Sequence, residues 1–153
     1  MIIGNLSKFG IWINGSIGNL SYIKFYVNGH SIGTFDDRTY TSMFINNFIH
    51  RLDTLHNLDI KLPNNKKKYA FNYIHKSDDR FVKYKLPIGD SFDDYYIYIY
   101  IYDNSTRITW KIVDEPFFCY HIDETKKIFD FKIDKDEVKR CLYKLKDIYE
   151  NNK

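Results

Sequence analysis

The chain is 153 residues long, with 44% hydrophobic residues, 28% charged residues and a net charge of +3. This composition is typical of a globular protein, and it argues against disordered, collagen-like and disulfide-framework chains. The length predicts a single domain over residues 1–153, which can bury about 70% of its unfolded surface without a metal or a disulfide.

The net charge is small, but the charges are segregated along the chain. Residues 57–85 carry eight basic and three acidic groups, with the lysine run 66–68 as their densest point. Residues 86–124 carry eight acidic groups against two basic ones, which gives a net charge of −6. Because a partner responds to local potential, this acidic central segment matters more than the total charge.

The N-terminal residues show no targeting segment. They lack a basic leader, a long apolar run and a small-residue cleavage site, so a signal peptide is not expected. The longest strongly apolar stretch, residues 95–102, is far shorter than the ~20 residues that cross a bilayer. The sequence therefore predicts a cytoplasmic protein without a membrane segment, in which Cys119 and Cys141 are buried, reduced thiols.

The first elements in chain order are short strands. Residues 11–13 are apolar and end at a turn, which predicts a strand. Residues 21–27 are apolar and β-branched, and they meet Asn-Gly at 28–29, a strong hairpin signal. The return strand is expected at 30–33.

The periodicity then changes from strand to helix and back. Apolar residues recur at helical spacing over about 39–56, and Asp36 or Asp37 is the expected N-cap of that helix. After the lysine run, residues 69–75 and 81–86 are interpreted as two strands.

Residues 95–102 show the clearest period-two pattern in the chain. Alternation places isoleucines 97, 99 and 101 on one face of the strand and tyrosines 96, 98, 100 and 102 on the other. Further strands are expected at 106–113, 117–122 and 128–133.

The C-terminal residues are helical in pattern over about 135–150. Asp134 and Glu137 stand three residues apart, which resembles a capping box at the start of this helix. Short links between strands require antiparallel pairing, and the two helices must bury their apolar stripes against the sheet. The predicted fold is therefore α+β, with a mostly antiparallel sheet of about six to eight strands and two main helices.

Catalytic and metal-binding motifs are not found in the sequence. The five histidines lack metal-ligand spacing, and no phosphate-binding, zinc-binding or nucleophile-elbow motif occurs. The chain is therefore expected not to be an enzyme and to need no metal or cofactor. A ribonuclease that uses two converging histidines and a lysine stays open as the weakest alternative.

The tyrosine face and the surrounding acidic residues are the most informative feature. Exposed tyrosines suit a protein interface, and they also suit base stacking in a small RNA-binding module. A third interpretation is that both faces of the sheet are covered and that the tyrosines are packing residues. Because the segment is acidic rather than basic, binding of nucleic acid by the tyrosine face is disfavoured. The lysine run 66–68 lies in an Asn-rich loop and is interpreted as a solvated turn.

The hypothesis that follows is an acidic, aromatic contact surface for a basic protein partner. Its candidate residues are Asp90, Asp93, Asp94, Tyr96, Tyr98, Tyr100, Asp114, Glu115, Asp123 and Glu124.

Four segments of the first sixty residues resemble a known family. They are MIIGN at 1–5, KFGI at 8–11, the hairpin FYVNG at 25–29 and the apolar helix at 39–55. In these segments the chain is similar to the bacterial immunity protein 42 family. The resemblance implies a cytoplasmic protein of contact-dependent growth inhibition or another polymorphic toxin system, which binds a cognate C-terminal toxin domain, often a nuclease. It supplies no catalytic or binding residues, and it leaves the oligomeric state open.

Overall fold

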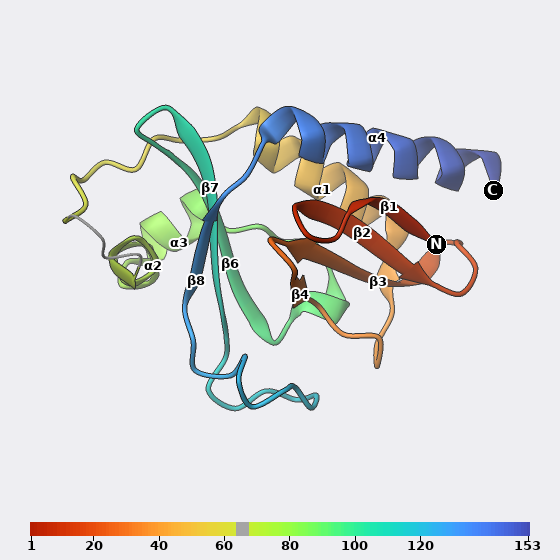
Figure 1. Cartoon of the computed structure of the whole chain (residues 1–153), viewed down its shortest axis with the longest axis horizontal. Helices are drawn as coiled ribbons and strands as arrows, with labels where there is room; N and C mark the ends of the chain where they lie inside the picture. The colour runs from red at the N-terminus through yellow and green to blue at the C-terminus, as the bar shows by residue number, and fades with distance from the viewer. Residues whose placement is uncertain (64–67) are drawn as a thin grey trace.

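The structure is a computed structural model that describes residues 1–63 and 68–153 (Figure 1). Its elements are β1 (Ile2–Asn5), β2 (Phe9–Asn14), β3 (Leu20–Val27), β4 (His30–Ile32), β5 (Thr39–Tyr40), α1 (Thr41–Asp53), α2 (Lys68–His75), α3 (Asp78–Tyr84), the 3₁₀ helix η1 (Asp90–Phe92), β6 (Tyr95–Tyr102), β7 (Ser105–Ile112), β8 (Phe129–Lys132) and α4 (Lys135–Asn151).

The described strands form two antiparallel sheets. The N-terminal sheet has the order β1-β2-β3-β4, with β5 paired to the start of β3, and the second sheet has the order β6-β7-β8. The helices α1 and α4 lie side by side and cover one face of the N-terminal sheet, whereas α2 and α3 lie beyond the second sheet (Figure 1). The predicted α+β class, the antiparallel pairing and the two main helices are confirmed; the strands divide into two sheets instead of one.

Two tight turns set the register of the hairpins. Asn28 and Gly29 both have positive φ, and so do Asp103 and Asn104 at the turn between β6 and β7. Two successive residues with positive φ are the requirement of a type I′ turn, whose twist matches that of the flanking strands. The predicted hairpin at 28–29 is confirmed.

Two of the predicted strands are in fact helices. Residues 69–75 lie within α2, because Ala70, Phe71 and Ile74 fall on one buried face of a helix. Residues 81–86 overlap α3, whose first turn carries Asp78 and Asp79 at the positive end of the helix dipole. Short apolar runs fit either period, so the sequence pattern alone does not separate the two structures.

Three smaller predictions are also corrected. The helix expected at 39–56 begins at Thr41 and has Tyr40, not Asp36 or Asp37, at its N-cap. The strand expected at 117–122 is a loop. Cys119 lies in this loop and is exposed, whereas Cys141 is buried as predicted.

The start of α4 agrees with its sequence signature. The side chain of Asp134 accepts hydrogen bonds from the backbone N–H groups of Asp136 and Glu137. These bonds satisfy donors that have no partner within the first turn of a helix. No helix of the described residues is long and apolar enough to cross a membrane.

The strand β6 separates two hydrophobic cores. Its isoleucines, including Ile97 and Ile99, pack in the main core with the N-terminal sheet, α1 and α4. Its tyrosines, including Tyr98 and Tyr100, pack in a second core with residues of α2 and α3. The predicted alternation of the two faces is confirmed, and both faces are covered.

Raising the pH above 10 is expected to destabilise the fold through its buried tyrosines. Burial raises the pKa of Tyr84 to about 12, and it also raises the pKa of Tyr95, Tyr98 and Tyr100. An unfolded tyrosine ionises near pH 10, so above that pH the folded state holds more protons than the unfolded state. Stability is therefore complete below pH 10 and falls as the pH rises, by up to about 1.4 kcal/mol per pH unit for each such group.

Urea unfolding between about pH 8 and pH 11.5, followed by circular dichroism, measures this loss. Tyr84→Phe removes one titrating group, so its stability is expected to fall less steeply with pH than that of the natural chain. Identical slopes for the two chains would contradict the role given to Tyr84.

Candidate functional site

Three carboxylates crowd one corner of the molecule where η1 leads into β6. Asp90 begins η1, Asp93 follows it, and both are exposed. Partial burial raises the pKa of Asp93 most, and the negative charges of Asp90 and Asp37 raise it further. We call Asp37, Asp90 and Asp93 the acidic corner. A cation placed there would relieve the mutual repulsion of these groups.

Tyr96 connects this corner to the acidic residues that follow β7. The side chain keeps part of its surface exposed, unlike those of its neighbours in β6. It lines a groove of about 410 Å³ together with Asp90 and Asp93. It also lines a groove of about 550 Å³ together with Asp114 and Glu115. The structure thus brings four of the predicted acidic contact residues to the two grooves that border Tyr96, itself a fifth.

Tyr98 and Tyr100 do not belong to this surface. Both side chains are 0% exposed, because α2 and α3 cover the tyrosine face of β6. The Tyr98 hydroxyl lies 2.7 Å from Nδ1 of His75, and the Tyr100 hydroxyl donates to the Asp130 carboxylate. Their removal from the candidate surface is a correction: they are packing residues of the second core and cannot meet a partner that docks on the folded chain.

Asp94 is buried as well, and its carboxylate is occupied. Oδ1 accepts the backbone N–H of Phe117 at 2.8 Å, and Oδ2 accepts the N–H of Phe118 and the hydroxyl of Tyr120, each at 2.9 Å. The side chain therefore holds a segment that is distant in the sequence. The prediction that Asp94 contacts a partner is wrong, because its carboxylate is buried and already bonded. We call this arrangement the Asp94 clamp.

The clamped segment is the long connection between β7 and β8. This β7–β8 loop, residues 113–128, extends away from both sheets at the bottom of the view in Figure 1. Asp114, Glu115 and Asp123 are exposed on it. Glu124 is partly exposed and lines a small cavity with His30 of β4, so the returning half of the loop lies against the edge of the N-terminal sheet.

The sequence pattern did not identify two exposed apolar residues of this loop. Phe117 is 86% exposed and Ile122 is 81% exposed, the highest values among the large apolar side chains of the described residues. Their apolar character predicts a strand over 117–122, whereas the structure has a loop there. The signal that could have found them is the loop chemistry around them, with Pro116 before and charged residues on both sides.

Two of the histidines, His75 and His30, pack among aromatic rings. His75 packs against the rings of Phe71 and Tyr96, and its pKa is lowered, first by burial and then by the positive charge of Lys111. His30 lies instead among the aromatic rings of the second sheet. In the part of the chain that the structure describes, no group of three or more His, Cys, Asp or Glu side chains is arranged to hold a metal ion.

Basic side chains border the grooves on one side. Lys85 lines the groove at the acidic corner, and Lys111 lies 3.3 Å from Asp114 at the second groove. The lysine run 66–68 reaches the described structure with Lys68, the first residue of α2, and its other two residues lie outside the described residues.

Comparison with known families assigns the chain to the immunity proteins. The matching family model is described as "Immunity protein 42" and spans residues 1–148, so the chain belongs to this family. The match extends well beyond the first sixty residues on which the sequence resemblance depended, and that resemblance is confirmed.

A solved structure has a similar fold. It is the crystal structure of CdiI from Burkholderia dolosa AUO158, with a TM-score of 0.63 and 14% sequence identity. The similarity covers 96% of this chain and 99% of the other, so the two proteins share the whole architecture. A comparison with curated proteins found no match.

Proposed function

We propose that this chain neutralises a toxin of contact-dependent growth inhibition by binding the toxin's C-terminal domain in the cytoplasm of the target cell. The family match over residues 1–148 carries this proposal. The fold shared with a protein named CdiI supports the assignment to contact-dependent inhibition. The packing of His75 and His30 among aromatic rings supports a function by binding.

The contact surface that we propose runs from the acidic corner across Tyr96 to the β7–β8 loop. Its acidic members are Asp90, Asp93, Asp114, Glu115, Asp123 and Glu124. Such a surface suits a basic partner, and nucleases are basic because their substrate is an anion. We therefore propose a nuclease as the toxin, captured through complementary charge.

Growth rescue tests the function directly. The open reading frame immediately upstream is sequenced, and the C-terminal toxin domain expected there is expressed in bacteria with and without this chain. Rescue of growth, together with co-purification of the two proteins, is the expected result. Arrested growth despite expression of both proteins would contradict the proposed function.

Reversing two charges of the proposed surface is expected to slow association with the toxin domain. Asp93→Lys with Glu115→Lys places positive charges on both sides of Tyr96, and long-range steering of a basic partner then becomes repulsion. The association rate constant is expected to fall at least about tenfold at low salt, and the difference is expected to shrink as salt screens the charges.

A matched control carries the same change of charge elsewhere. Asp147 and Glu150 are exposed residues of α4, which lies on the opposite side of the molecule from the β7–β8 loop (Figure 1). Asp147→Lys with Glu150→Lys is expected to leave the association rate nearly unchanged. Equal slowing of both double variants in surface plasmon resonance would mean that the net charge matters and the proposed surface does not.

A further inference from the structure

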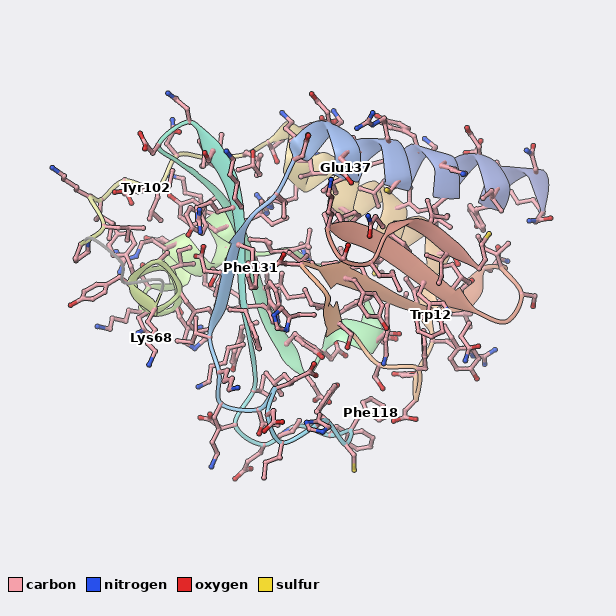
Figure 2. All side chains as sticks on the ribbon, viewed as in Figure 1. Trp12, Lys68, Tyr102, Phe118, Phe131 and Glu137 are labelled. Atoms are coloured by element: carbon pink, nitrogen blue, oxygen red, sulfur yellow. The ribbon has the colours of Figure 1, made fainter. Side chains whose placement is uncertain are left out.

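The β7–β8 loop presents apolar side chains to water in a fixed position. Phe117 and Ile122 are almost fully exposed, although each would gain roughly 1.5–3 kcal/mol from burial. Large apolar side chains that extend together from a surface are characteristic of protein interaction sites. Figure 2 shows the labelled Phe118 at the lower end of the molecule, on the loop that extends below both sheets.

The Asp94 clamp makes this loop an ordered element. Asp94 is 7% exposed and accepts three hydrogen bonds from residues 117–120. The ring of Phe118 packs edge-on against that of Phe117 at 4.9 Å, and the ring of Tyr120 packs against Tyr95 of β6 at 5.5 Å. A segment that is already held in place loses little conformational entropy when a partner binds it.

The charges around the apolar pair indicate the kind of partner. Asp114 and Glu115 precede the pair, and Asp123 and Glu124 follow it, while Lys126 and Lys127 come only afterwards. These four carboxylates repel an anionic membrane surface, and they equally repel the same loop of a second copy of this chain. The surface is complementary to a protein that has an apolar depression within a basic face.

We propose that Phe117 and Ile122 are the apolar anchors that enter the toxin domain, and that Asp94 is the residue that positions Phe117, whose backbone N–H it accepts. This inference rests on the proposed function and adds to it the element that holds the complex together. The carboxylates then govern how fast the toxin domain is captured, and the two apolar side chains govern how long it stays bound.

Dissociation kinetics test the anchors. The probe is a catalytically inactivated form of the toxin C-terminal domain from the growth-rescue experiment, and the full chain is immobilised. Phe117→Ala and Ile122→Ala are each expected to raise the dissociation rate constant about tenfold or more, with an association rate within about twofold of the natural chain. Both variants are expected to fold normally, because the side chains are exposed and make little contact with the core.

Tyr143→Ala is the matched control, since Tyr143 is 45% exposed on α4, away from the loop. It is expected to leave dissociation unchanged. If the natural chain binds the domain while Phe117→Ala and Ile122→Ala dissociate at the natural rate, the anchors are wrong and the proposed function stands. If the natural chain itself fails to bind, the proposed function is wrong.

Hydrogen exchange tests the role of Asp94. Asp94→Asn keeps the shape of the side chain but replaces one acceptor oxygen by an amide that donates. The amide protons of Phe117 and Phe118 are expected to exchange at least about tenfold faster, with those of β6 and β7 unchanged, and the toxin domain is expected to dissociate faster. Unchanged exchange at these two amides would contradict the positioning role. Faster exchange without faster dissociation of the toxin domain would contradict it as well.

Discussion

Replacing Gly89 by alanine is expected to destabilise the protein by about 4 kcal/mol. Gly89 has a φ of +122°, a region in which side chains are strained at a cost of about 1–3 kcal/mol. An added Cβ would lie 1.6 Å from Oγ1 of Thr39, a distance at which one of the two must move. Thr39 is 0% exposed, so the surrounding core resists that movement, and overpacking adds about 1–3 kcal/mol.

Gly15→Ala separates the two causes. Gly15 has a φ of +82°, and a Cβ built on it meets no atom within 4 Å. This variant is expected to lose only about 1–2 kcal/mol, the cost of the backbone conformation alone. Urea unfolding at neutral pH measures both variants. Equal losses at the two glycines would contradict the clash with Thr39.

The position of Gly89 also matters for the proposed binding surface. It immediately precedes η1, which begins with Asp90 of the acidic corner, and it lines the adjoining groove. A shift of the chain at Gly89 therefore moves Asp90 and Asp93 relative to Tyr96. In Gly89→Ala the association rate with the toxin domain is expected to fall even at temperatures where the variant stays folded.

Asp130→Ala is expected to cost about 3 kcal/mol of stability. Asp130 is 3% exposed in β8 and accepts the Arg107 guanidinium on one carboxylate oxygen, at 2.7 Å, and the Tyr100 hydroxyl on the other. Removing the carboxylate leaves a cation and a hydroxyl without this partner across two strands. Breaking a buried pair in this way costs about 3–5 kcal/mol. The lower end applies here because 26% of the Arg107 side chain is exposed.

The exposed pair at the end of β7 is the matched control. Lys111 and Asp114 lie 3.3 Å apart, and the Asp114 side chain is 85% exposed. Asp114→Ala is expected to change stability by less than about 1 kcal/mol, as is usual for surface ion pairs. Thermal and urea unfolding compare the two variants, and a loss at Asp130 as small as that at Asp114 would contradict the network.

The elements with a clear period or a defined turn could be predicted from the sequence. The alternation in 95–102 gave the correct faces of β6, and Asn28-Gly29 gave the correct hairpin. Asp134 gave the correct start of α4. Each of these signals is local, because the residues that form the contact lie within a few positions of one another.

The error at α2 and α3 also produced the main error in the candidate site. Ala70, Phe71 and Ile74 fit a strand or a helix, and the strand interpretation left no helices to cover the tyrosine face. The covered tyrosine face was one of the interpretations that the sequence left open, and for Tyr98 and Tyr100 it is the correct one. Tertiary packing, which the local pattern does not contain, decided both questions.

The acidic residues were found because charge is visible in the sequence, but their individual roles were not. Asp93 and Asp94 are neighbours, yet one is exposed and the other is buried beneath a loop that begins almost twenty residues later. Nothing in the spacing distinguishes them. The separation depends on the return of the β7–β8 loop, which is a long-range contact.

The same loop contains an exposed thiol that can carry a fluorescent label, so binding of the toxin domain can be followed directly. Cys119 lies exposed between Phe118 and Tyr120, whereas Cys141 is buried and its thiol has a pKa raised chiefly by that burial. Reactivity requires an accessible thiolate, so a maleimide dye modifies Cys119 in preference to Cys141. A single fluorophore thus reaches the proposed interface of the natural chain without any engineered cysteine, and its emission can report the arrival of a partner in real time.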